Sequence, residues 1–322
     1  MISFLQKIET DGGPKNFQKK FFNWLISNNV KYDFCDDLFE LKKIIFVNAG
    51  SKRILYLLIQ KLLGAKIIQR LDGFNDLKKM KNSRFKIKIY LSNLSMNFIR
   101  KYLANKIIYQ SLFVKERWEK KFGISDKNSC VIHNAYFSRK KQRVKKSKKF
   151  SILIMEGNVQ DNDITFKLLK CILEVSKINT KIENIYVLGN TNEKIKNLFI
   201  KYKKLKFMGF SSKEKLEYII KKNKLIYFPI EFNASCPNSL IELTSYGIPS
   251  CFLDNGSLSE LSKFSSIKIK CFSINLMTIN SINNVLNRIN IKYSLYSELS
   301  FLLSRRYNNN LIFKKYIDFI QT

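Results

Sequence analysis

The chain has 322 residues, with 58 Lys and Arg against 25 Asp and Glu, which gives a formal net charge of +33. Its length suggests about two domains. With 45% hydrophobic and 13% aromatic residues it is far too apolar for a disordered polycation. Only ten of the 58 basic residues are Arg, so we attribute most of the charge to a Lys-rich compositional bias. The charge still leaves nucleic acid, acidic membranes and phosphorylated ligands open as partners.

The cysteines and the apolar segments indicate the cellular compartment. Six cysteines are scattered without a C-x-x-C pair or a cluster with the lone His133, so we expect isolated, reduced thiols. The start lacks the pattern of a signal peptide, and no segment reaches the ~20 apolar residues that span a bilayer. We expect a cytoplasmic protein, soluble or attached peripherally to the inner face of the membrane.

Short β-branched runs alternate with longer amphipathic segments through the first 133 residues. This alternation predicts a parallel β-sheet with crossover helices. The expected strands are 44–47, 66–71, 106–109 and 130–133. The expected helices are 16–27, 51–63, 94–105 and 112–122.

A basic segment at 138–149 interrupts the pattern. Eight of its twelve residues are basic and only Val144 is apolar, so it is the best linker candidate, with a basic tail for anions as the alternative. After it the alternation restarts. The expected strands are 150–155, 184–188, 205–208, 225–229 and 250–253. The expected helices are 165–176, 193–202, 213–221, 238–246, 281–289, 294–304 and 311–320.

This pattern predicts an α/β fold of two βα domains, with ligand bound in the cleft between the sheets at the carboxyl ends of their strands. We expect an N-terminal domain over 1–137, the linker at 138–149, a second domain over 150–304 and a C-terminal helix over 305–322. The spacing of Phe313, Tyr316 and Phe319 predicts one buried helix face, which we expect to pack on the first domain.

Two loops in the first half carry residues suited to a ligand site. Asp11-Gly12-Gly13-Pro14 lies between the first strand and a helix, where the glycines allow close approach and the helix start offers free N–H groups. An ordinary tight turn is the alternative. Arg70-Leu71-Asp72-Gly73 directly follows an apolar strand, a favoured site position in parallel sheets, with Asp72 as a helix cap as the alternative.

Two further strand ends have a structural interpretation. Ser111 is suited to cap the helix that follows it. His133 has no Ser, Cys or carboxylate motif assigned to it, and we interpret it as structural.

The strongest motif runs from Ala234 to Pro249. A polar loop leads into a helix near Asn238, which ends at Gly247, a favourable C-cap. Glu242 lies one turn inside this helix, where its carboxylate can accept two hydrogen bonds from the vicinal diol of a ribose. The helix start directs N–H groups toward a phosphate. The motif predicts nucleotide recognition, with a capped surface helix and a solvated Glu242 as the alternative.

The segment C-P-N-S-L-I-E-L-T-S-Y-G-I-P-S, followed by D-N-G-S-L-S-E-L, closely resembles the donor-site signature of glycosyltransferase family 4. D-G-G-P-K-N-F, I-I-Q-R-L-D-G-F-N, I-I-Y-Q-S-L-F-V-K and V-I-H-N-A agree with that family in order. The resemblance implies the GT-B fold: two Rossmann-like domains facing each other across a cleft, with a C-terminal helix crossing back to the first. It also implies a retaining, metal-independent transfer of a sugar from a nucleoside diphosphate sugar to an acceptor hydroxyl, with no cofactor.

The resemblance assigns roles by position. Glu242 would bind the donor ribose, and Gly12 and Gly13 would form a loop near the phosphates and the acceptor. Asp72 stands where many members have a His near the transferred sugar, and we assign it, with Glu231, to catalysis. The other expected donor-binding residues are Arg70, Gly157, Asn158, Cys236, Pro237, Asn238, Ser239 and Leu240. No metal ligand is expected.

The chain departs from the family at two places. Members typically carry an acid eight positions before the helix Glu; here that position is Ala234, and Glu231 is the candidate replacement. Members also usually carry an Arg and a Lys after the first strand of the second domain, whereas 156–163 here has three acids and no cation. A departing diphosphate needs charge stabilisation, for which Arg70 and Lys167 are candidates.

We therefore expect a retaining glycosyltransferase of bacterial-type surface polysaccharide or glycolipid biosynthesis. Its partners would be a nucleotide-sugar donor, a glycan or lipid-linked acceptor and an anionic membrane surface, with no specific nucleic acid. The alternative is a catalytically degenerate GT-B protein that binds nucleotide-sugar or glycan without transfer. A nucleic-acid-binding protein and a nucleotide-sugar epimerase of the same fold are the other hypotheses.

Overall fold

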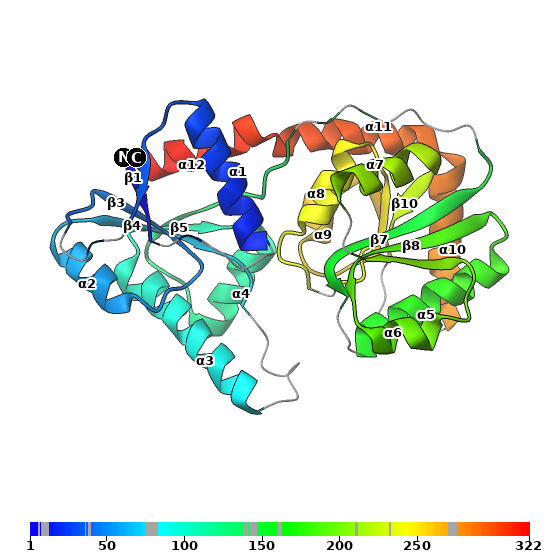
Figure 1. The fold of residues 1–322 in the computed structure, drawn as a ribbon, viewed down its shortest axis with the longest axis horizontal. Helices are drawn as coiled ribbons and strands as arrows, with labels where there is room; N and C mark the ends of the chain where they lie inside the picture. Colours follow the sequence, from blue (N-terminus) through cyan, green and yellow to red (C-terminus); the bar gives the residue numbers. More distant parts are fainter. Residues whose placement is uncertain are drawn as a thin grey trace. The chain divides into compact units, whose positions relative to one another are not determined.

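A computed structural model of the chain describes residues 1–5, 7, 13–35, 37, 40–74, 83–137, 139, 141, 147–159, 163–209, 212–231, 233–269 and 276–322. These residues form two compact units (Figure 1). Unit 1 comprises Met1–Ala135 with Asn309–Thr322, and unit 2 comprises Tyr136–Asn308. Most of the expected linker at 138–149 lies outside the described residues.

Unit 1 is built on a six-stranded parallel sheet with the order β2-β1-β3-β4-β5-β6. Its strands are β1 (Ile2–Phe4), β2 (Tyr32–Phe34), β3 (Ile44–Asn48), β4 (Lys66–Leu71), β5 (Lys106–Tyr109) and β6 (Asn128–Val131). Its helices are α1 (Gly13–Ser27), α2 (Ile54–Leu62), α3 (Ser83–Phe98), the π-helical turn η2 (Ile99–Leu103), α4 (Leu112–Phe122) and α12 (Asn309–Gln321). The order reverses beside β1, which makes the β1–β3 edge a favoured ligand position.

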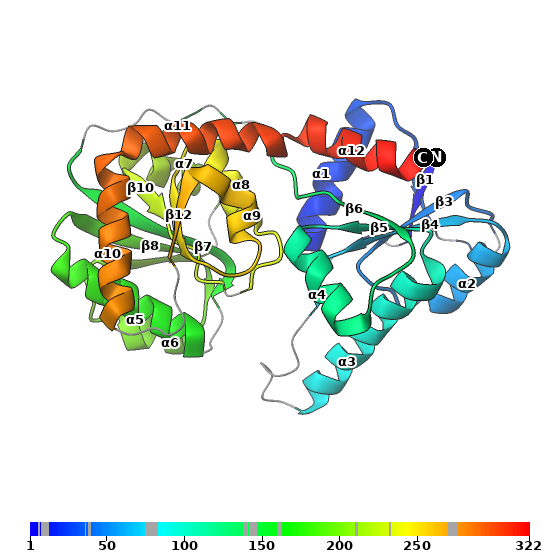
Figure 2. The same cartoon turned by 180° about the vertical axis from the view of Figure 1, so that it is seen from behind.

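Helices cover both faces of this sheet (Figures 1 and 2). Because crossovers are right-handed, the connection from β1 to β2 places α1 on one face, while the connections that follow β3 place α2, α3 and α4 on the other. The returning helix α12 lies beside α1, and Phe313 and Tyr316 pack there against Phe17 and Phe21. Phe319 packs on the same cluster. The predicted docking of the C-terminal helix on the first sheet is therefore confirmed.

One buried side chain joins several elements of unit 1. Arg70, at the end of β4, is only 1% exposed. Its Nε donates to the Tyr316 hydroxyl of α12 at 3.0 Å, and its Nη1 donates to Asn48 Oδ1 of β3 at 2.8 Å. Its Nη2 donates to Asn134 Oδ1, beyond β6, at 2.7 Å.

The remaining N–H donors of Arg70 are met by Gln110, which directly follows β5. With the Gln110 amide turned so that its oxygen faces the guanidinium, that oxygen accepts from Nη1 at 2.9 Å and from Nη2 at 3.1 Å. The guanidinium carbon lies 3.7 Å from the centre of the Phe17 ring. These bonds use all five guanidinium N–H donors. Arg70 thus holds the carboxyl ends of four strands and α12 in register.

Unit 2 has a second six-stranded parallel sheet with the order β12-β11-β10-β7-β8-β9. Its strands are β7 (Phe150–Val159), β8 (Ile182–Thr191), β9 (Leu205–Gly209), β10 (Leu225–Tyr227), β11 (Ser250–Leu253) and β12 (Ser266–Ile269). Its helices are α5 (Asp163–Ile178), α6 (Glu193–Phe199), α7 (Lys213–Lys222), α8 (Asn238–Ser245), α9 (Leu258–Ser262), α10 (Leu276–Ile291) and α11 (Tyr293–Ser304), with the 3₁₀ turns η3 (Lys263–Ser265) and η4 (Arg305–Tyr307). This order reverses beside β7, as in dinucleotide-binding folds.

Two apolar clusters fill the faces of the unit 2 sheet. One lies under α5, α6 and α10 and includes Ile152, Ile172 and Leu286. The other lies under α7, α8, α9 and α11 and includes Leu153 and Leu243. Neighbouring residues of β7 therefore point to opposite clusters, which is why this strand reads as a continuous apolar run.

Arg70→Met should destabilise unit 1 by about 3 kcal/mol or more, because it leaves several buried polar acceptors without their donor. Tyr316→Phe should cost about 1–2 kcal/mol, since its hydroxyl accepts from Arg70 Nε at 3.0 Å and donates to the Ile132 carbonyl at 3.4 Å. Both Trp residues of the chain, Trp24 and Trp118, are buried in unit 1, so their fluorescence in a urea titration reports its unfolding selectively.

The matched control for Arg70 is Arg305→Met, because Arg305 is exposed on η4 in unit 2. This variant should leave the Trp transition within about 0.5 kcal/mol of the unsubstituted protein. Equal stability of the Arg70 and Arg305 variants would contradict the role given to Arg70.

Candidate functional site

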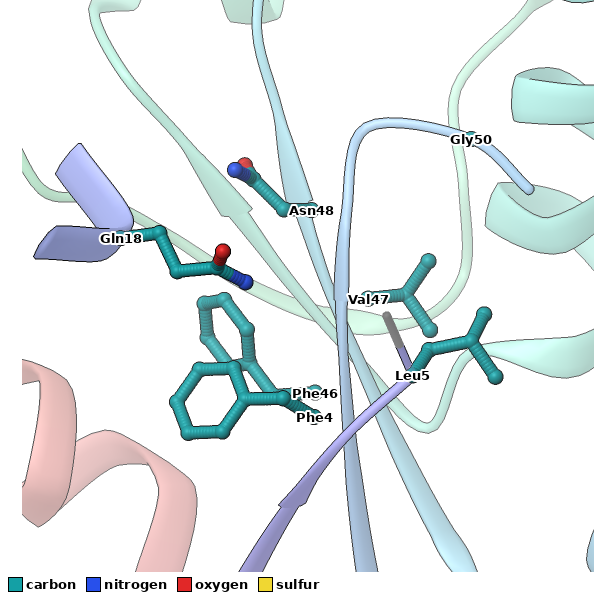
Figure 3. A pocket seen from close by; sticks show the side chains of 7 residues that line it. All are labelled: Phe4, Leu5, Gln18, Phe46, Val47, Asn48 and Gly50. Carbon is teal, nitrogen blue, oxygen red and sulfur yellow. The ribbon is translucent and has the colours of Figure 1, made fainter. Parts of the chain in front are cut away.

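The unit 1 strand-end site lies where β1 and β3 end, at the reversal of strand order. A small pocket opens there (Figure 3). Its lining residues are Phe4, Leu5, Gln18, Phe46, Val47, Asn48 and Gly50. Asn48 Oδ1 is bound by Arg70, whereas Asn48 Nδ2 is buried and has no hydrogen-bond partner within the described residues. A buried donor without a partner is costly, so this pocket offers a hydrogen bond to a ligand oxygen.

Asp72 lies at the end of the next strand, partly exposed. Its carbonyl accepts from Trp118 Nε1 at 2.8 Å, and its Oδ1 accepts from the N–H of Gly73 at 2.7 Å. Asp72 does not cap a helix within the described residues, since α3 begins only at Ser83. The carboxylate is thus held at the strand-end edge of unit 1.

The other predicted residues of unit 1 have these positions. Gly12 lies outside the described residues, and Gly13 is the exposed first residue of α1. Ser111 caps α4 by accepting from Val114 N at 3.1 Å, which confirms that prediction. Arg70 is predicted to bind the nucleotide-sugar donor, but all of its N–H groups form hydrogen bonds inside unit 1. Direct contact with a phosphate would require it to give up one of these bonds.

The unit 2 strand-end site lies where β7 and β10 end. Glu156 of β7 is partly buried, and its Oε1 accepts from the N–H groups of Ile230 at 3.1 Å and Glu231 at 3.3 Å. Burial, and next the nearby Glu231 carboxylate, raise the pKa of Glu156 to about 8. Glu156 is therefore mostly an uncharged carboxylic acid at pH 7, able to donate as well as accept.

A bulge in β7 sets the position of Glu156. The pairing of β7 with β8 shifts between Met155 and Asn158. Opposite it, Gly189 has φ +134°, and a Cβ there would lie 2.1 Å from the Glu156 carbonyl oxygen. Only glycine fits this approach. Gly157, inside the bulge, and Asn158, at its end, are predicted to bind the sugar donor, and both are exposed.

The loop before α8 is fixed by the loop after β11. Asn255 Oδ1 accepts from the Asn233 N–H at 2.9 Å, and the Ala234 carbonyl accepts from Ser257 N at 2.9 Å and Ser257 Oγ at 3.0 Å. A Cβ on Gly256 would lie 2.7 Å from Ala234 N. Ala234 is consequently buried between two loops, whereas Glu231 is exposed.

Helix α8 presents the predicted nucleotide motif. Its N-cap, Pro237, has no side-chain acceptor for the first N–H groups of the helix. Ser239 Oγ, in the first turn, is hydrogen-bonded to the buried Tyr227 hydroxyl at 2.8 Å, which ties α8 to β10. Glu242 is partly exposed one turn further on. Cys236 and Leu240 are buried, so they can offer only backbone groups.

The end of α8 has the predicted glycine cap. Gly247 has φ +75°, its N–H donates to the Thr244 carbonyl at 2.9 Å, and Ile248 N–H donates to the Leu243 carbonyl at 3.1 Å. These two bonds form a Schellman motif, and the C-cap prediction is confirmed.

Glu156 is the site residue that the sequence assignment missed. The sequence shows three acids after the first strand of unit 2, but it gives no indication that one of them is partly buried beside Glu231. Within the described parts of the chain, no three His, Cys, Asp or Glu side chains gather into a group that could hold a metal. Among those same residues, no helix combines the length and apolarity that a membrane span requires.

Comparisons with known proteins agree with this architecture. No family model matches the chain, and no curated protein sequence matches it. Among solved structures, HepE from Anabaena in complex with UDP and glucose aligns over 99% of both chains, with a TM-score of 0.68 and 10% identity. The lipopolysaccharide outer core galactosyltransferase WaaB aligns over 98% of both chains, with a TM-score of 0.67 and 14% identity.

A glycosyltransferase from Rickettsia africae aligns over 98% of this chain and 84% of its own, with a TM-score of 0.62 and 13% identity. At such identities the likeness concerns the fold. The chain has the GT-B fold, as the sequence predicted.

Gly189→Ala should lower the thermal stability of unit 2, because the new Cβ collides with the Glu156 carbonyl and the backbone dihedral is unfavourable. We expect a loss of about 2 kcal/mol or more, measured by calorimetry or far-UV circular dichroism. Gly157→Ala is the control, since nothing lies within 4 Å of its added Cβ. Equal melting temperatures for the two variants would refute the close approach.

The raised pKa of Glu156 makes stability depend on pH. In the unfolded chain a Glu titrates near pH 4.3, so between about pH 5 and 8 the folded protein holds a proton that the unfolded chain has released. Stability should therefore fall as pH rises through this window, by up to about 1.4 kcal/mol per pH unit. Glu156→Gln, which keeps the acceptor oxygen, should flatten the profile of urea unfolding against pH. Parallel profiles for the two proteins would exclude the shifted pKa.

Proposed function

We propose that the protein is a glycosyltransferase that moves a sugar from a nucleoside diphosphate sugar to an acceptor hydroxyl. The proposal rests on the unit 2 strand-end site. There Glu242 lies one turn inside α8, and the first N–H groups of α8 have no side-chain cap. This helix belongs to the unit whose strand order reverses beside β7. The GT-B fold supports the proposal, since HepE is known in complex with UDP and glucose and with UDP-glucose.

The donor would bind to unit 2. In this proposal Glu242 accepts from both ribose hydroxyls, and the backbone from Cys236 to Leu240, with the first N–H groups of α8, receives the diphosphate. Gly157 and Asn158 supply exposed backbone and amide groups next to Glu156. In unit 1, Gly12 and Gly13 would offer backbone groups to a ligand from the sequence before α1.

The leaving diphosphate would be stabilised without a lysine or arginine on the β7 loop. A neutral Glu156 does not repel it and can donate a hydrogen bond to one of its oxygens. Arg70 would act within unit 1, where it orients Asn48 and Asn134 and leaves a positive charge behind them, rather than by direct contact with an anion. Preorganised donors of this kind stabilise charge that develops as a bond breaks.

Asp72 and Glu231 are the proposed catalytic carboxylates. Asp72 would orient the transferred sugar or the acceptor hydroxyl from unit 1, and Glu231 would hold sugar hydroxyls from unit 2. We further propose a retaining, metal-independent reaction of the glycosyltransferase family 4 type, serving bacterial surface polysaccharide or glycolipid synthesis. The acceptor would be a glycan or a lipid-linked sugar, and the buried Asn48 Nδ2 in the unit 1 pocket is suited to one of its oxygens.

A binding protein without transfer activity is the second candidate. It is favoured by Ala234, whose burial between two loops leaves no acid at the position where the family has one. Turnover separates the two candidates: a donor that binds but is not consumed, with glycan and lipid-linked acceptors present, would establish the binding protein.

Glu242→Ala should weaken nucleotide binding by roughly 10- to 100-fold, because it removes two charge-assisted hydrogen bonds to the ribose. The measurement is thermal stabilisation by UDP, GDP, ADP and CMP, followed by calorimetric titration of the best of these.

The matched control is Glu174→Ala, on α5 of the same unit, where Glu174 pairs with Lys177 at 2.8 Å. It should leave affinity unchanged. Failure of all four nucleotides to bind at millimolar concentration would overturn the proposed function, and unchanged affinity in Glu242→Ala would overturn the ribose assignment alone.

A further inference from the structure

Helix α3 and the turn η2 carry a row of large apolar side chains that point to solvent. We call these residues the outer row. They are Ile87, Tyr90, Leu91, Leu94, Phe98 and Tyr102. Ile87 is 63% exposed and Leu91 58% exposed, and the rings of Phe98 and Tyr102 lie 5.2 Å apart. Figures 1 and 2 show the first turns of α3 extending past the other helices of unit 1.

The outer row is a continuous stripe. At 3.6 residues per turn, its members fall within about 120° of the helix circumference. The opposite side of the same helix is buried by Asn93, Met96, Ile99 and Leu103. One apolar face of such a helix packs on the core of unit 1, and a second apolar face exposed to solvent indicates an interaction surface.

Helix α2 enlarges this surface. Leu55 and Leu62 are exposed on it, with Leu62 at 86%. Lys61 Nζ donates to the carbonyl oxygens of Tyr102 at 2.7 Å and Leu103 at 2.9 Å, so the end of α2 adjoins the end of the outer row.

The stretch of sequence that carries the outer row has charge of one sign. Between Asp76 and Glu116 the sequence has ten basic residues and no acidic one. Lys86 and Lys88 are exposed on the two sides of the row, each about 100° from Ile87, and Lys101 is exposed beside Tyr102.

We propose that the outer row of α3, with the exposed leucines of α2, docks this protein on an anionic phospholipid bilayer. The apolar side chains would enter the boundary between headgroups and acyl chains, and the flanking lysines would reach lipid phosphates. A second copy of the chain is a poor occupant, because two surfaces of the same positive sign repel each other. This attachment does not depend on the proposed donor chemistry.

The test is binding of the full chain to vesicles, measured by flotation without nucleotide. The protein should bind vesicles of phosphatidylcholine with about one third phosphatidylglycerol about 100-fold more tightly than vesicles of phosphatidylcholine alone, and salt should weaken the binding. The double variant Ile87→Ser and Leu91→Ser should bind at least about tenfold more weakly, and Lys86→Gln with Lys88→Gln about tenfold more weakly.

The matched control is Ile178→Ser with Ile200→Ser, which removes two side chains that are also exposed, but in unit 2. It should bind vesicles like the unsubstituted protein. In the Tyr90→Trp variant, the fluorescence of the new Trp should shift to shorter wavelength when vesicles are added. The buried Trp24 and Trp118 should give a constant background.

Several results would overturn the proposal. They are absence of vesicle binding, equal binding to neutral and anionic vesicles, and equal loss in the unit 2 control. Concentration-dependent dimers that the Ile87 and Leu91 substitutions abolish would assign the surface to a second copy instead. Nucleotide binding is measured separately, so loss of the proposed function and loss of membrane docking are distinguishable.

Discussion

The reversal of strand order beside β1 and beside β7 is the constraint that places the two candidate sites of this protein. Right-handed crossovers send the chain away from β1 and β7 in both directions, so the loops at their carboxyl ends diverge and leave backbone and side chains accessible. In unit 1 this edge holds the pocket beside Asn48. In unit 2 it holds Glu156 and Glu231. Residues distant in the sequence meet there because the topology brings them together.

The strand-end edge of unit 1 has a buried positive charge, and the β7 edge of unit 2 has two carboxyl groups close together. In unit 1 the buried cation Arg70 donates to hydroxyl and amide oxygens, so its charge is held in place without being neutralised. In unit 2 two carboxyl groups lie close together, and burial with mutual repulsion favours a proton on Glu156. One edge therefore keeps a positive charge and the other loses a negative one. Both arrangements lower the electrostatic cost of bringing an anionic ligand to a strand end.

The sequence predicts most of this fold, because hydrophobic periodicity and caps are local. The run from Lys66 to Leu71 and the helix from Leu112 to Phe122 are found with the predicted bounds. The strands β2 and β12 are not predicted, because each is short and half-buried and so lacks a clear apolar run. Most of helix α3 is not predicted, because apolar residues on two of its faces obscure the helical periodicity of hydrophobic residues. Only its end, from residue 94, falls in an expected helix. The pKa of Glu156 and the bonds of Arg70 depend on tertiary contacts that no local pattern contains.

The net charge of +33 acts differently at long and short range. Beyond a Debye length of about 8–10 Å, salt screens exposed lysines, so they raise the encounter rate with anionic partners more than they stabilise a bound phosphate. Stabilisation at the reacting atoms needs groups fixed within hydrogen-bond distance. In the proposed function, the groups at the β7 edge would be the start of α8, which has no side-chain cap, and the uncharged acid of Glu156. The net positive charge and the groups fixed at the β7 edge thus act by different physical means, and the absence of Lys and Arg from residues 156–163 does not follow from the composition of the rest of the chain.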